Sequence, residues 1–399
     1  YNGGFIGTDG LDAPDPPTID SVTAGDAQVS VAFTAGTAGT TATTGFVVQV
    51  STDGTDYSAG SNTGTSSPIV VSSLTNGTAA TAKVWAINAH GTSAPSDASS
   101  SFSPVQFSRG LFAGGEWSGG STVNIIDYIT IASTGNATDF GDLDQARYGS
   151  GGFSSSTRGV FAGGYASSDV NKIQYVTIAS TGNASDFGDL LANLQALPGA
   201  LSSSVRGVIG GGFEDSGGTN RIQYVTIAST GNATDFGDLT ASRWYLTGTS
   251  SPTRGLFAGG NSSNVTIDYI TIASTGNATD FGDLISGGND GGQAGASNGT
   301  RAVFGGNSTP SNQIDYVTIA STGNASDFGN LTTSRGFAAG TSATGVDRAV
   351  FGAGGHGGSG QNVVDYITVS STGNASDFGD LTAARASLGA CSSAHGGLS

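Results

Sequence analysis

The segment STGNATDFGDL, at residues 133–143, recurs almost unchanged at six places in the chain and carries several groups that could do chemistry. Its carboxylate and amide oxygens are ligand types that calcium accepts. Its Asn-Ala-Thr or Asn-Ala-Ser is an acceptor sequence for N-glycosylation in a secreted protein. Its Asp-Phe-Gly is also the triplet with which protein kinases hold magnesium. A fourth interpretation is structural: the segment recurs because one structural unit recurs.

The surrounding sequence favours the structural interpretation. No glycine-rich loop or catalytic-loop motif accompanies Asp-Phe-Gly, and the acidic spacing matches no loop that wraps calcium. Glycosylation stays open, because it depends on the compartment. Thr-Gly-Asn is a turn signal, since Gly supplies positive φ and Asn bonds nearby backbone. We therefore expect a turn and then an outer strand with Phe and Leu facing inward, whose exposed Asp side chains discourage edge pairing.

No other constellation points to an enzyme. The chain has three histidines, His90, His356 and His395, which lie in different regions, and one cysteine, Cys391. Neither a metal cluster nor a Ser-His-Asp arrangement can be built from that spacing. The lone Cys391 is interpreted as a small core residue. We expect no catalytic residue, no metal site and no cofactor.

The composition indicates an almost entirely β protein. Of 399 residues, 67 are Gly, none is Met and only 11% are charged, while Thr, Ser, Val, Ile, Phe and Tyr dominate the rest. The net charge of −17 argues against nucleic acid or an anionic membrane as partner. No apolar run approaches 18 residues, so we expect no membrane insertion. The chain begins at Tyr1 without an initiator Met or a signal-like segment, which suggests that its true start has been removed.

Residues 104–399 are a sixfold repeat. Each unit of 45–50 residues runs from an Arg through an apolar strand, two glycines, a variable loop, a strand such as IDYIT, and then the STGNATDFGDL segment. Four short strands in a unit of this length are typical of a β-propeller blade. The repeated Arg residues are Arg109, Arg158, Arg206, Arg254, Arg301 and Arg348. We interpret them as surface or inter-blade hydrogen-bonding groups, with an anion-binding ring around the axis as the alternative.

The order of these signals resembles the kelch family of β-propellers. The double glycine, the Tyr of the third strand and the aromatic residue of the fourth follow that order, with Phe in place of the family's Trp. The double glycines are Gly114-Gly115, Gly163-Gly164, Gly211-Gly212, Gly259-Gly260, Gly305-Gly306 and Gly354-Gly355. The repeat opens with a second strand at RGLFAGG and ends with a first strand at ARASLGACSSAHGGLS. We therefore expect six blades, closed by pairing of the last residues beside Arg109–Gly115.

Two classes of enzyme are built on β-propellers of this kind. Copper oxidases with kelch-type propellers would need several His and Tyr ligands that the sequence does not supply. Sialidase propellers would need an arginine cluster, a nucleophilic Tyr and a repeated Asp-box turn with Trp, and that turn is missing. We expect no enzymatic activity.

Residues 14–103 alternate apolar and polar residues in short runs separated by turn residues, which predicts a β-sandwich. The runs PDPPTIDSVTAGDAQVSVAF, TGFVVQVSTDG and SSLTNGTAATAKVWAINAHGTSAPS resemble a fibronectin type III domain. Phe33 takes the place of that family's buried Trp, and Ala80 the place of its corner Tyr. Residues 1–13 would then be an extended N-terminal anchor segment.

Comparing the repeats locates a candidate binding surface without any alignment. The loops after the double glycines and the loops entering the next blade differ between units, and both belong to one face, the variable face. The constant face carries the STGNA turns and the SSTR turns. Exposed aromatic and polar residues of the kind that bind sugars lie in the variable loops: Glu116, Trp117, Tyr148, Tyr165, Phe213, Asp215, Trp244, Tyr245 and His356. The alternative is that these aromatics only cap blade ends or touch a neighbouring subunit.

These features together predict a non-enzymatic adhesion protein on a virion surface or outside a cell. The composition of the whole chain, which is rich in Ser, Thr, Gly and Asn, resembles that of structural and tail-fibre-like proteins of marine bacteriophages. The expected partners are other virion or surface proteins, bound through the N-terminal segment, and a host glycan or surface protein; homo-oligomerisation stays open. The alternatives are a secreted bacterial adhesin or matrix protein, and a structural decoration protein without a ligand.

Overall fold

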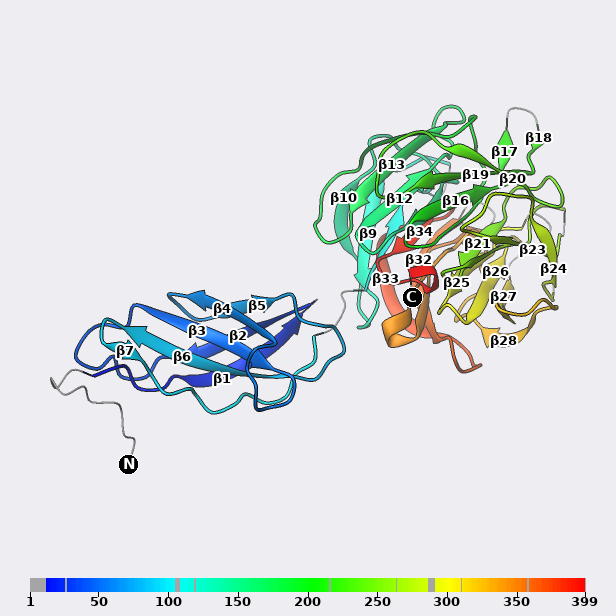
Figure 1. Cartoon of the computed structure of the whole chain (residues 1–399). Helices are drawn as coiled ribbons and strands as arrows, with labels where there is room; N and C mark the ends of the chain where they lie inside the picture. Colours follow the sequence, from blue (N-terminus) through cyan, green and yellow to red (C-terminus); the bar gives the residue numbers. More distant parts are fainter. Residues whose placement is uncertain are drawn as a thin grey trace. The chain divides into compact units, whose positions relative to one another are not determined.

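The structure is a computed structural model that describes residues 12–25, 27–104, 108–117, 120–214, 217–262, 264–285, 291–309, 311–356 and 359–398. The chain divides into two compact units, Tyr1–Phe107 (unit 1) and Ser108–Ser399 (unit 2) (Figure 1). Both are built from antiparallel strands, which confirms the predicted all-β class. Two short 3-10 turns, η1 (Thr344–Val346) and η2 (Gly396–Leu398), are the helical elements of the described residues. The described part of the chain holds no helix with the length and apolar character needed to cross a bilayer.

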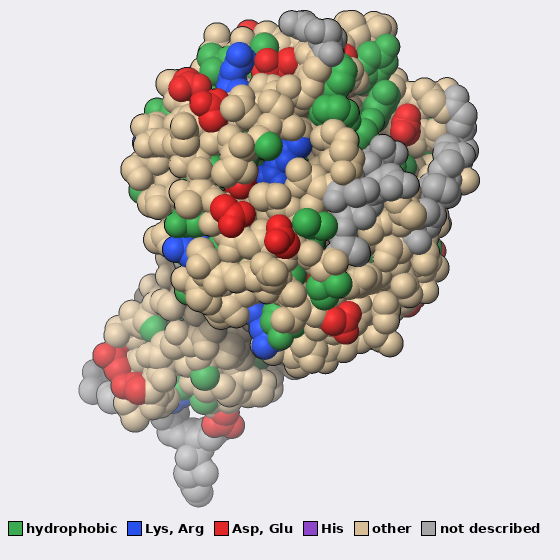
Figure 2. All heavy atoms as spheres, turned by 90° about the vertical axis from the view of Figure 1, so that its right-hand side faces the viewer, with side chains coloured by type: hydrophobic (Ala, Val, Ile, Leu, Met, Phe, Trp, Pro, Cys, Tyr) green, Lys and Arg blue, Asp and Glu red, His purple; other side chains and the backbone are tan. Residues whose placement is uncertain are grey.

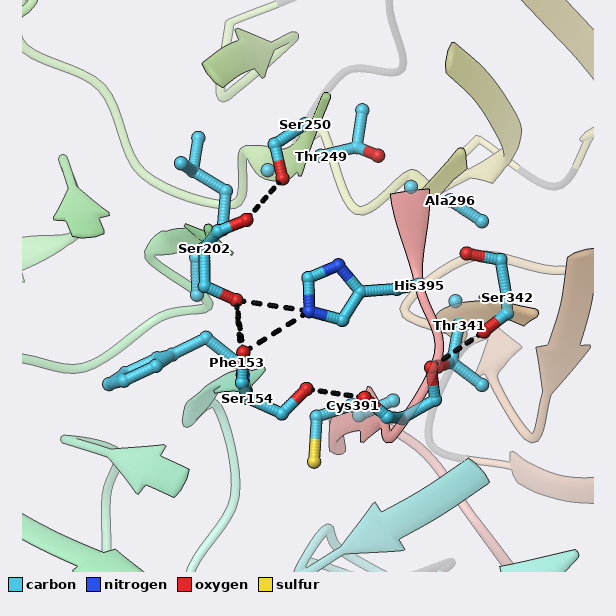
Figure 3. Close-up of a pocket in the computed structure, with 18 of the residues that line it drawn as sticks. Phe153, Ser154, Ser202, Thr249, Ser250, Ala296, Thr341, Ser342, Cys391 and His395 are labelled. Carbon is cyan, nitrogen blue, oxygen red and sulfur yellow. Dashed lines mark hydrogen bonds between the residues drawn. The ribbon is translucent and has the colours of Figure 1, made fainter. Parts of the chain in front are cut away.

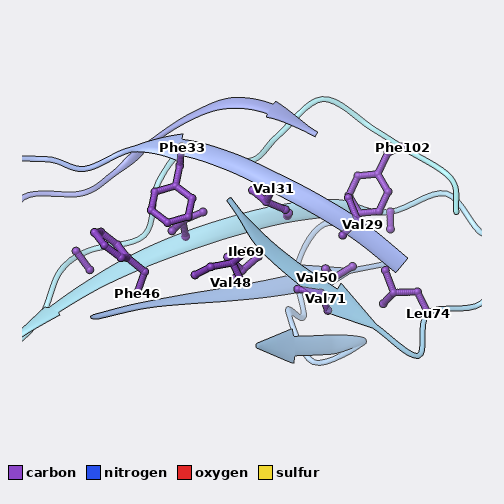
Figure 4. Packing of buried hydrophobic residues seen from close by; sticks show 14 residues of the cluster. Val29, Val31, Phe33, Phe46, Val48, Val50, Ile69, Val71, Leu74 and Phe102 are labelled. Atoms are coloured by element: carbon purple, nitrogen blue, oxygen red, sulfur yellow. The ribbon is translucent and has the colours of Figure 1, made fainter. Parts of the chain in front are cut away.

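Unit 1 consists of two sheets around one apolar core. One sheet contains, in spatial order, β1 (Thr18–Gly25), β2 (Gln28–Thr34) and β5 (Ile69–Ser72). The other contains β4 (Gly60–Gly64), β3 (Gly45–Ser51), β6 (Thr81–Asn88) and β7 (Gly91–Thr92). Alternate residues of β2, β3 and β6 are buried between the sheets, as the period of two requires (Figure 4). Phe33 is buried here and lies 4.7 Å from Phe46 between ring centroids.

Unit 2 contains six sheets of the same design, which we call repeat sheets 1 to 6. Each has four main strands, and the sixth also carries the short strand β31 (Gly355–His356). From the innermost strand outward, they are β34 (Gly389–Ser392), β8 (Arg109–Ala113), β9 (Ile125–Thr130) and β10 (Thr138–Asp142); β11 (Gly151–Ser154), β12 (Arg158–Ala162), β13 (Lys172–Thr177) and β14 (Ser185–Asp189); β15 (Gly199–Ser202), β16 (Arg206–Gly210), β19 (Arg221–Thr226) and β20 (Thr234–Asp238); β21 (Thr247–Ser250), β22 (Arg254–Ala258), β23 (Thr266–Thr271) and β24 (Thr279–Asp283); β25 (Ala294–Ser297), β26 (Arg301–Asn307), β27 (Ser311–Thr318) and β28 (Ser326–Asn330); and β29 (Ala339–Ala343), β30 (Arg348–Gly352), β32 (Ser359–Thr368) and β33 (Ser376–Arg385). A separate hairpin, β17 (Phe213–Glu214) and β18 (Gly217–Gly218), projects from repeat sheet 3.

The first repeat sheet joins the two ends of unit 2. β34 pairs with β8 in antiparallel register from Gly389 opposite Ala113 to Ser392 opposite Gly110, which is the predicted pairing of the last strand with the first. The innermost strands also contact one another in a cycle from β34 through β11, β15, β21, β25 and β29 back to β34. The six repeat sheets are therefore connected in a circle by contacts among their innermost strands.

Six serines at the ends of the innermost strands make a second cycle, the serine ring. Each hydroxyl donates a hydrogen bond of 2.6–2.8 Å to the carbonyl oxygen of the equivalent serine in an adjacent sheet. The donors are Ser154, Ser202, Ser250, Ser297, Ser342 and Ser392. Between the innermost strands remain two small cavities of about 40 and 60 Å³. That space holds a few waters at most, so the centre of unit 2 is not a ligand channel.

The imidazole of His395 lies at the serine ring and lines the cavity there (Figure 3). Its Nδ1 accepts a hydrogen bond from the Gly397 amide (3.1 Å), which leaves the proton on Nε2. Nε2 lies 3.2 Å from the Ser154 carbonyl oxygen and 3.1 Å from the Ser202 hydroxyl. Burial lowers the pKa of His395 from 6.5 to about 4, against the opposing effect of the Ser154 carbonyl. The folded protein therefore holds this histidine neutral.

The repeated STGNA turn is a joint between neighbouring sheets. In the joint between repeat sheets 1 and 2, the Gly182 amide donates to the Phe140 carbonyl (2.8 Å), and the Asp142 amide donates to Asn183 Oδ1 (3.1 Å). Gly141 has φ +144°, and a Cβ there would lie 2.5 Å from the Gly182 oxygen. The same asparagine bond recurs at all six joints. The edge of each outer strand is thus covered by hydrogen bonds to the next sheet, and exposed charge is not what protects it.

The predicted inward side chains of the repeated segment are buried. Phe140 and Leu143 are 2% and 1% exposed, and they pack with residues of the neighbouring sheet such as Val176. The equivalents of Phe140 in the other five repeats are also 2% exposed. The segment is therefore a packing and joining element, as its sequence predicted.

The six repeated arginines form a further joint. Arg109 donates from Nη1 to the Ile178 carbonyl of the next sheet (2.9 Å) and lies 4.7 Å over the ring of Tyr128 in its own sheet. Equivalent bonds and stacks occur in every repeat, and Arg348 completes the circle by donating to Ile131 (2.9 Å). The interpretation as inter-blade hydrogen-bonding groups is confirmed, and the guanidinium groups do not surround the axis.

A second set of arginines, in the loops entering the next sheet, is buried with aspartate partners. Arg243, Arg335 and Arg385 bind Asp268, Asp365 and Asp127 at 2.7–2.9 Å, and all six side chains are at most 1% exposed. Each aspartate pairs across the sheet with a phenylalanine of the second strand. In repeat sheet 2 that position is Gln174, opposite Phe161. The buried Arg147 therefore has no carboxylate at the equivalent place, and its Nη2 has no hydrogen-bond partner.

The predicted equivalence of the six double glycines is wrong in two of the six repeats. In repeat sheets 1 to 4 both glycines have positive φ. In repeat sheet 5 the register places Gly306 and Asn307 at the equivalent sites, and in repeat sheet 6 Ala353 (φ +60°) and Gly354 (φ +100°). In the last repeat Ala353 replaces the first glycine, and Gly355 stands where repeat sheet 1 has Glu116.

Replacing Gln174 by Asp supplies the missing carboxylate to Arg147. We expect the free energy of unfolding to rise by about 1.5–3 kcal/mol, the range for a hydrogen bond to a charged group. The matched change Asp268→Asn removes a carboxylate from a complete pair and should lower it by about 3–5 kcal/mol. Chemical denaturation at neutral pH measures both. A destabilised Gln174→Asp protein would contradict this account of the buried arginines.

The neutral His395 makes stability depend on pH. Its pKa is lower in the folded protein than in the unfolded chain, so its contribution is complete above pH 6.5 and is lost as the pH falls toward about 4. The native protein should therefore lose about 3 kcal/mol more than His395→Gln between pH 7 and 4. Denaturation of both proteins at several pH values measures this difference. Parallel pH profiles would contradict a buried neutral histidine.

Candidate functional site

A ring of backbone hydrogen bonds lies where the chain enters each innermost strand, on the variable face. The Gly149 amide donates to the Ser387 carbonyl (2.8 Å), the Ser387 amide to Phe337 (2.9 Å) and the Phe337 amide to Gly292 (2.8 Å). The series continues through Tyr245 and Ala196 and is closed by the Leu197 amide, which donates to Gly149 (3.0 Å). We call this the backbone ring; its members are Gly149, Ala196, Tyr245, Gly292, Phe337 and Ser387.

All six members of the backbone ring have left-handed backbone conformations, with φ between +55° and +80°. Two are glycines, for which this conformation is easy. For a residue such as Tyr245 or Phe337 it is strained and persists only where the surroundings over-determine it. The hydrogen bonds on both sides of each residue supply that constraint.

Next to the backbone ring, each repeat brings two residues into a short backbone pairing, the bridge positions. Tyr148 and Tyr165 exchange two backbone hydrogen bonds, of 3.0 and 2.8 Å. Equivalent backbone pairing occurs in the other five repeats, in two of them through a single backbone hydrogen bond. The six pairs are Glu116 with Ala386, Tyr165 with Tyr148, Phe213 with Gln195, Asn261 with Trp244, Ser308 with Gly291, and Gly355 with Gly336.

These bridge positions combine a constant backbone with different side chains. One pair carries two phenol rings, another a phenylalanine with an amide, and another no side chain at all. The backbone need not change when these side chains change. The bridge positions can therefore carry side chains of different chemistry on one backbone arrangement. In repeat sheets 1 to 4 these side chains include aromatic and polar groups.

The aromatic side chains on this frame pack in pairs. Tyr148 and Tyr165 have ring centroids 5.5 Å apart, Phe213 and Trp244 5.3 Å, and Tyr245 and Phe337 5.2 Å. These six side chains are half-buried, because each covers its partner and leaves other atoms in solvent. Trp117, one residue beyond a bridge position, is 46% exposed.

Glu116 is a carboxylate at a bridge position of this surface. It is half-buried and bonded to the side chain of Ser387, and its burial raises its pKa despite that bond. Tyr148 also has a raised pKa, chiefly because of its burial and then because of the charges of Glu116 and three further groups, Tyr245, Tyr165 and Asp169. Glu116, Tyr245, Tyr165 and Asp169 are therefore close enough to act on Tyr148.

Most residues proposed from the sequence lie on this one frame. Glu116, Tyr148, Tyr165, Phe213 and Trp244 are at bridge positions, Tyr245 is in the backbone ring and Trp117 adjoins Glu116. His356 takes the position equivalent to Trp117 in repeat sheet 6, in β31. Asp215 lies outside the described residues.

Sequence reasoning missed three residues of the surface. Phe337 and Ser387 belong to the backbone ring, and Gln195 pairs with Phe213. Aligning the entry loops on the residue before each innermost strand would have placed Phe337 at the position of Tyr245. The two loops have the same length, with Arg243 and Arg335 two residues before Tyr245 and Phe337, so this spacing was a usable signal.

Cys391 and His395 are two further reactive groups of the described residues, and both lie at the innermost strands. The described residues contain no group of three or more His, Cys, Asp or Glu side chains placed to hold a metal. Cys391 is buried, and burial raises the pKa of its thiol to about 12, which removes it as a nucleophile. His395 is enclosed by the serine ring.

The sequence matches no protein-family model and no curated protein. The geometry of the variable face is therefore the basis for a functional proposal.

The aromatic side chains of the variable face should be dispensable for folding. Trp117→Ala removes a side chain that is half exposed, so we expect a change in the free energy of unfolding within about 0.5 kcal/mol. The comparison is Phe140→Ala, which removes a buried ring and should cost about 3–5 kcal/mol. Denaturant titration measures both. A large loss of stability in Trp117→Ala would show that this residue serves the fold.

Proposed function

We propose that unit 2 is a closed six-bladed β-propeller of kelch-like order, in which repeat sheets 1 to 6 are the blades. Three observations support closure: the pairing of β34 with β8, the serine ring and the backbone ring. Unit 1 is a fibronectin type III-like spacer, in keeping with its two-sheet organisation and single core.

The proposed function is non-enzymatic recognition at a virion or cell surface, with the variable face as the binding surface. The observation that carries this proposal is the set of bridge positions. Six copies of one backbone arrangement bear six different pairs of side chains, while the joints of the opposite face are repeated almost without change. Variation confined to one face of a repeated scaffold is what a recognition surface requires.

The exposed chemistry suits a host glycan or the surface of a host protein. Aromatic side chains with adjoining polar groups stack on sugar rings and accept or donate hydrogen bonds at their rims. Residues 1–13 would anchor the protein to other structural proteins of the particle; of these, residues 1–11 lie outside the described residues. Display of many copies on one particle would strengthen weak binding by orders of magnitude.

The test is attachment of the whole chain to host cells or to immobilised glycans. The double variant Trp117→Ala with Trp244→Ala should bind at least about tenfold more weakly, because exposed aromatic anchors contribute 1–2 kcal/mol or more each. The matched control is Val205→Ala, which removes an apolar side chain that is 58% exposed beside Arg206 on the constant face.

Unchanged attachment of the double variant would remove the variable face as the binding site. Absence of attachment by the native protein to any cell or glycan would favour the alternative of a decoration protein without a ligand. Turnover of a host polysaccharide would contradict the non-enzymatic proposal.

A further inference from the structure

Every basic side chain of unit 2 already has an intramolecular role. The chain has 13 lysines and arginines, of which Lys83 lies in unit 1 and the other twelve in unit 2. All twelve belong to the described residues, so their surroundings can be followed one by one. They fall into three groups.

The first group is the six arginines of the joints. Each donates to a backbone carbonyl of the neighbouring sheet and stacks at 4.2–4.8 Å over a tyrosine ring of its own sheet. They lie at the starts of the second strands, next to the turns of the constant face. A ligand on the variable face does not reach them.

The second group is the four buried arginines, Arg147, Arg243, Arg335 and Arg385, none more than 1% exposed. Three are neutralised by aspartates. Arg147 lacks that partner but donates to the Lys172 carbonyl (3.2 Å) and is enclosed by protein. None of the four can pair with a ligand in solvent.

The third group is the pair of basic residues at the start of third strands, toward the variable face. Lys172 forms an ion pair with Asp144, and Arg221 forms one with Glu214 at 3.1 Å. Their side chains are about one third exposed, at 35% and 34%. Each cation is therefore already matched by a carboxylate.

Figure 2 shows one face of the molecule, on which basic side chains appear as small separate spots and acidic side chains are also scattered. The described carboxylates at this surface include Glu116, Asp169 and Glu214. Its two basic side chains, Lys172 and Arg221, are already paired with carboxylates. An anionic ligand would lose its hydration there without gaining a counterion, and the net charge of −17 would repel it at longer range.

The aromatic groups also argue against a cationic ligand. A cage for an ammonium group needs several rings that face one another across a gap. Here the rings of Tyr148 and Tyr165 contact each other directly, as do those of Phe213 and Trp244. These two pairs therefore leave no gap between their rings for an ammonium group, whereas their partly exposed edges and the 46% exposed Trp117 remain available to a sugar.

From this distribution of charge we infer that the ligand of the variable face is an uncharged glycan, bound on the aromatic pairs with Glu116 accepting hydrogen bonds from its hydroxyl groups. The inference rests on the proposed function and specifies the class of ligand. The tyrosine hydroxyls and the Gln195 amide lie on the same frame and supply donors for the glycan's other oxygens.

The test compares the intact protein on arrays of neutral oligosaccharides (glucans, mannans and galactans) and on matched sialylated, sulfated and phosphorylated versions. Neutral glycans should bind at least about tenfold better than acidic ones carrying the same backbone. Raising NaCl from about 50 to 500 mM should change the dissociation constant less than about twofold, because no ion pair is made. Glu116→Gln should weaken neutral binding, and Glu116→Lys should improve binding of the acidic versions relative to the neutral ones.

The outcomes separate the inference from the proposed function. Preference for acidic glycans, preference for choline-bearing glycans, or strong salt dependence would overturn the inference and leave recognition by the variable face intact. Binding to cells through protein receptors alone would also overturn it. Failure of the native protein to attach to any cell or glycan would instead refute the proposed function. Thermal melting of each variant confirms that the frame is folded in every comparison.

Discussion

The joint between neighbouring sheets is the constraint on which the rest of unit 2 depends. Six joints must close one circle, so each must turn the chain by the same amount. At the joint between repeat sheets 1 and 2 the backbones of Gly141 and Gly182 approach too closely for a side chain, and Asn183 holds the neighbouring strand. This need explains why the STGNATDFGDL segment is repeated: its Gly and Asn residues make the joint, and its Phe and Leu fill the space beneath it.

Closure at the joints fixes the backbone elsewhere. The serine ring and the backbone ring each return to their starting residue only because all six sheets are present. The backbone ring holds Tyr245, Phe337 and Ser387 in left-handed conformations that would be strained in an open chain. Because backbone hydrogen bonds hold this frame, its outward side chains can differ between repeats without destabilising the fold. One face of the repeat can therefore carry different side chains in each sheet.

Much of this organisation could be predicted from the sequence because it is periodic. The strands, the buried Phe140 and Leu143, the arginine joints and the pairing of the last strand all follow from positions that recur. The residues that were not predicted are those whose role depends on a partner from another sheet. Nothing local in Ser154 shows that it faces the axis, and the buried arginines recur in four of the six entry loops, at positions where three of them pair with an aspartate of the next sheet. Substitutions at the glycine sites, Asn307 in one repeat and Ala353 in another, moved the visible double glycines of the last two repeats by one position.

The division of labour between the two faces is most directly tested by hydrogen–deuterium exchange of the whole chain, measured with and without the host surface material that it binds. The account predicts added protection in the variable face, at residues 115–117, 147–149, 164–166, 212–214 and 243–246, and unchanged exchange in the six STGNA turns. Protection confined to those turns, or to unit 1, would contradict the claim that the variable face is the recognition surface.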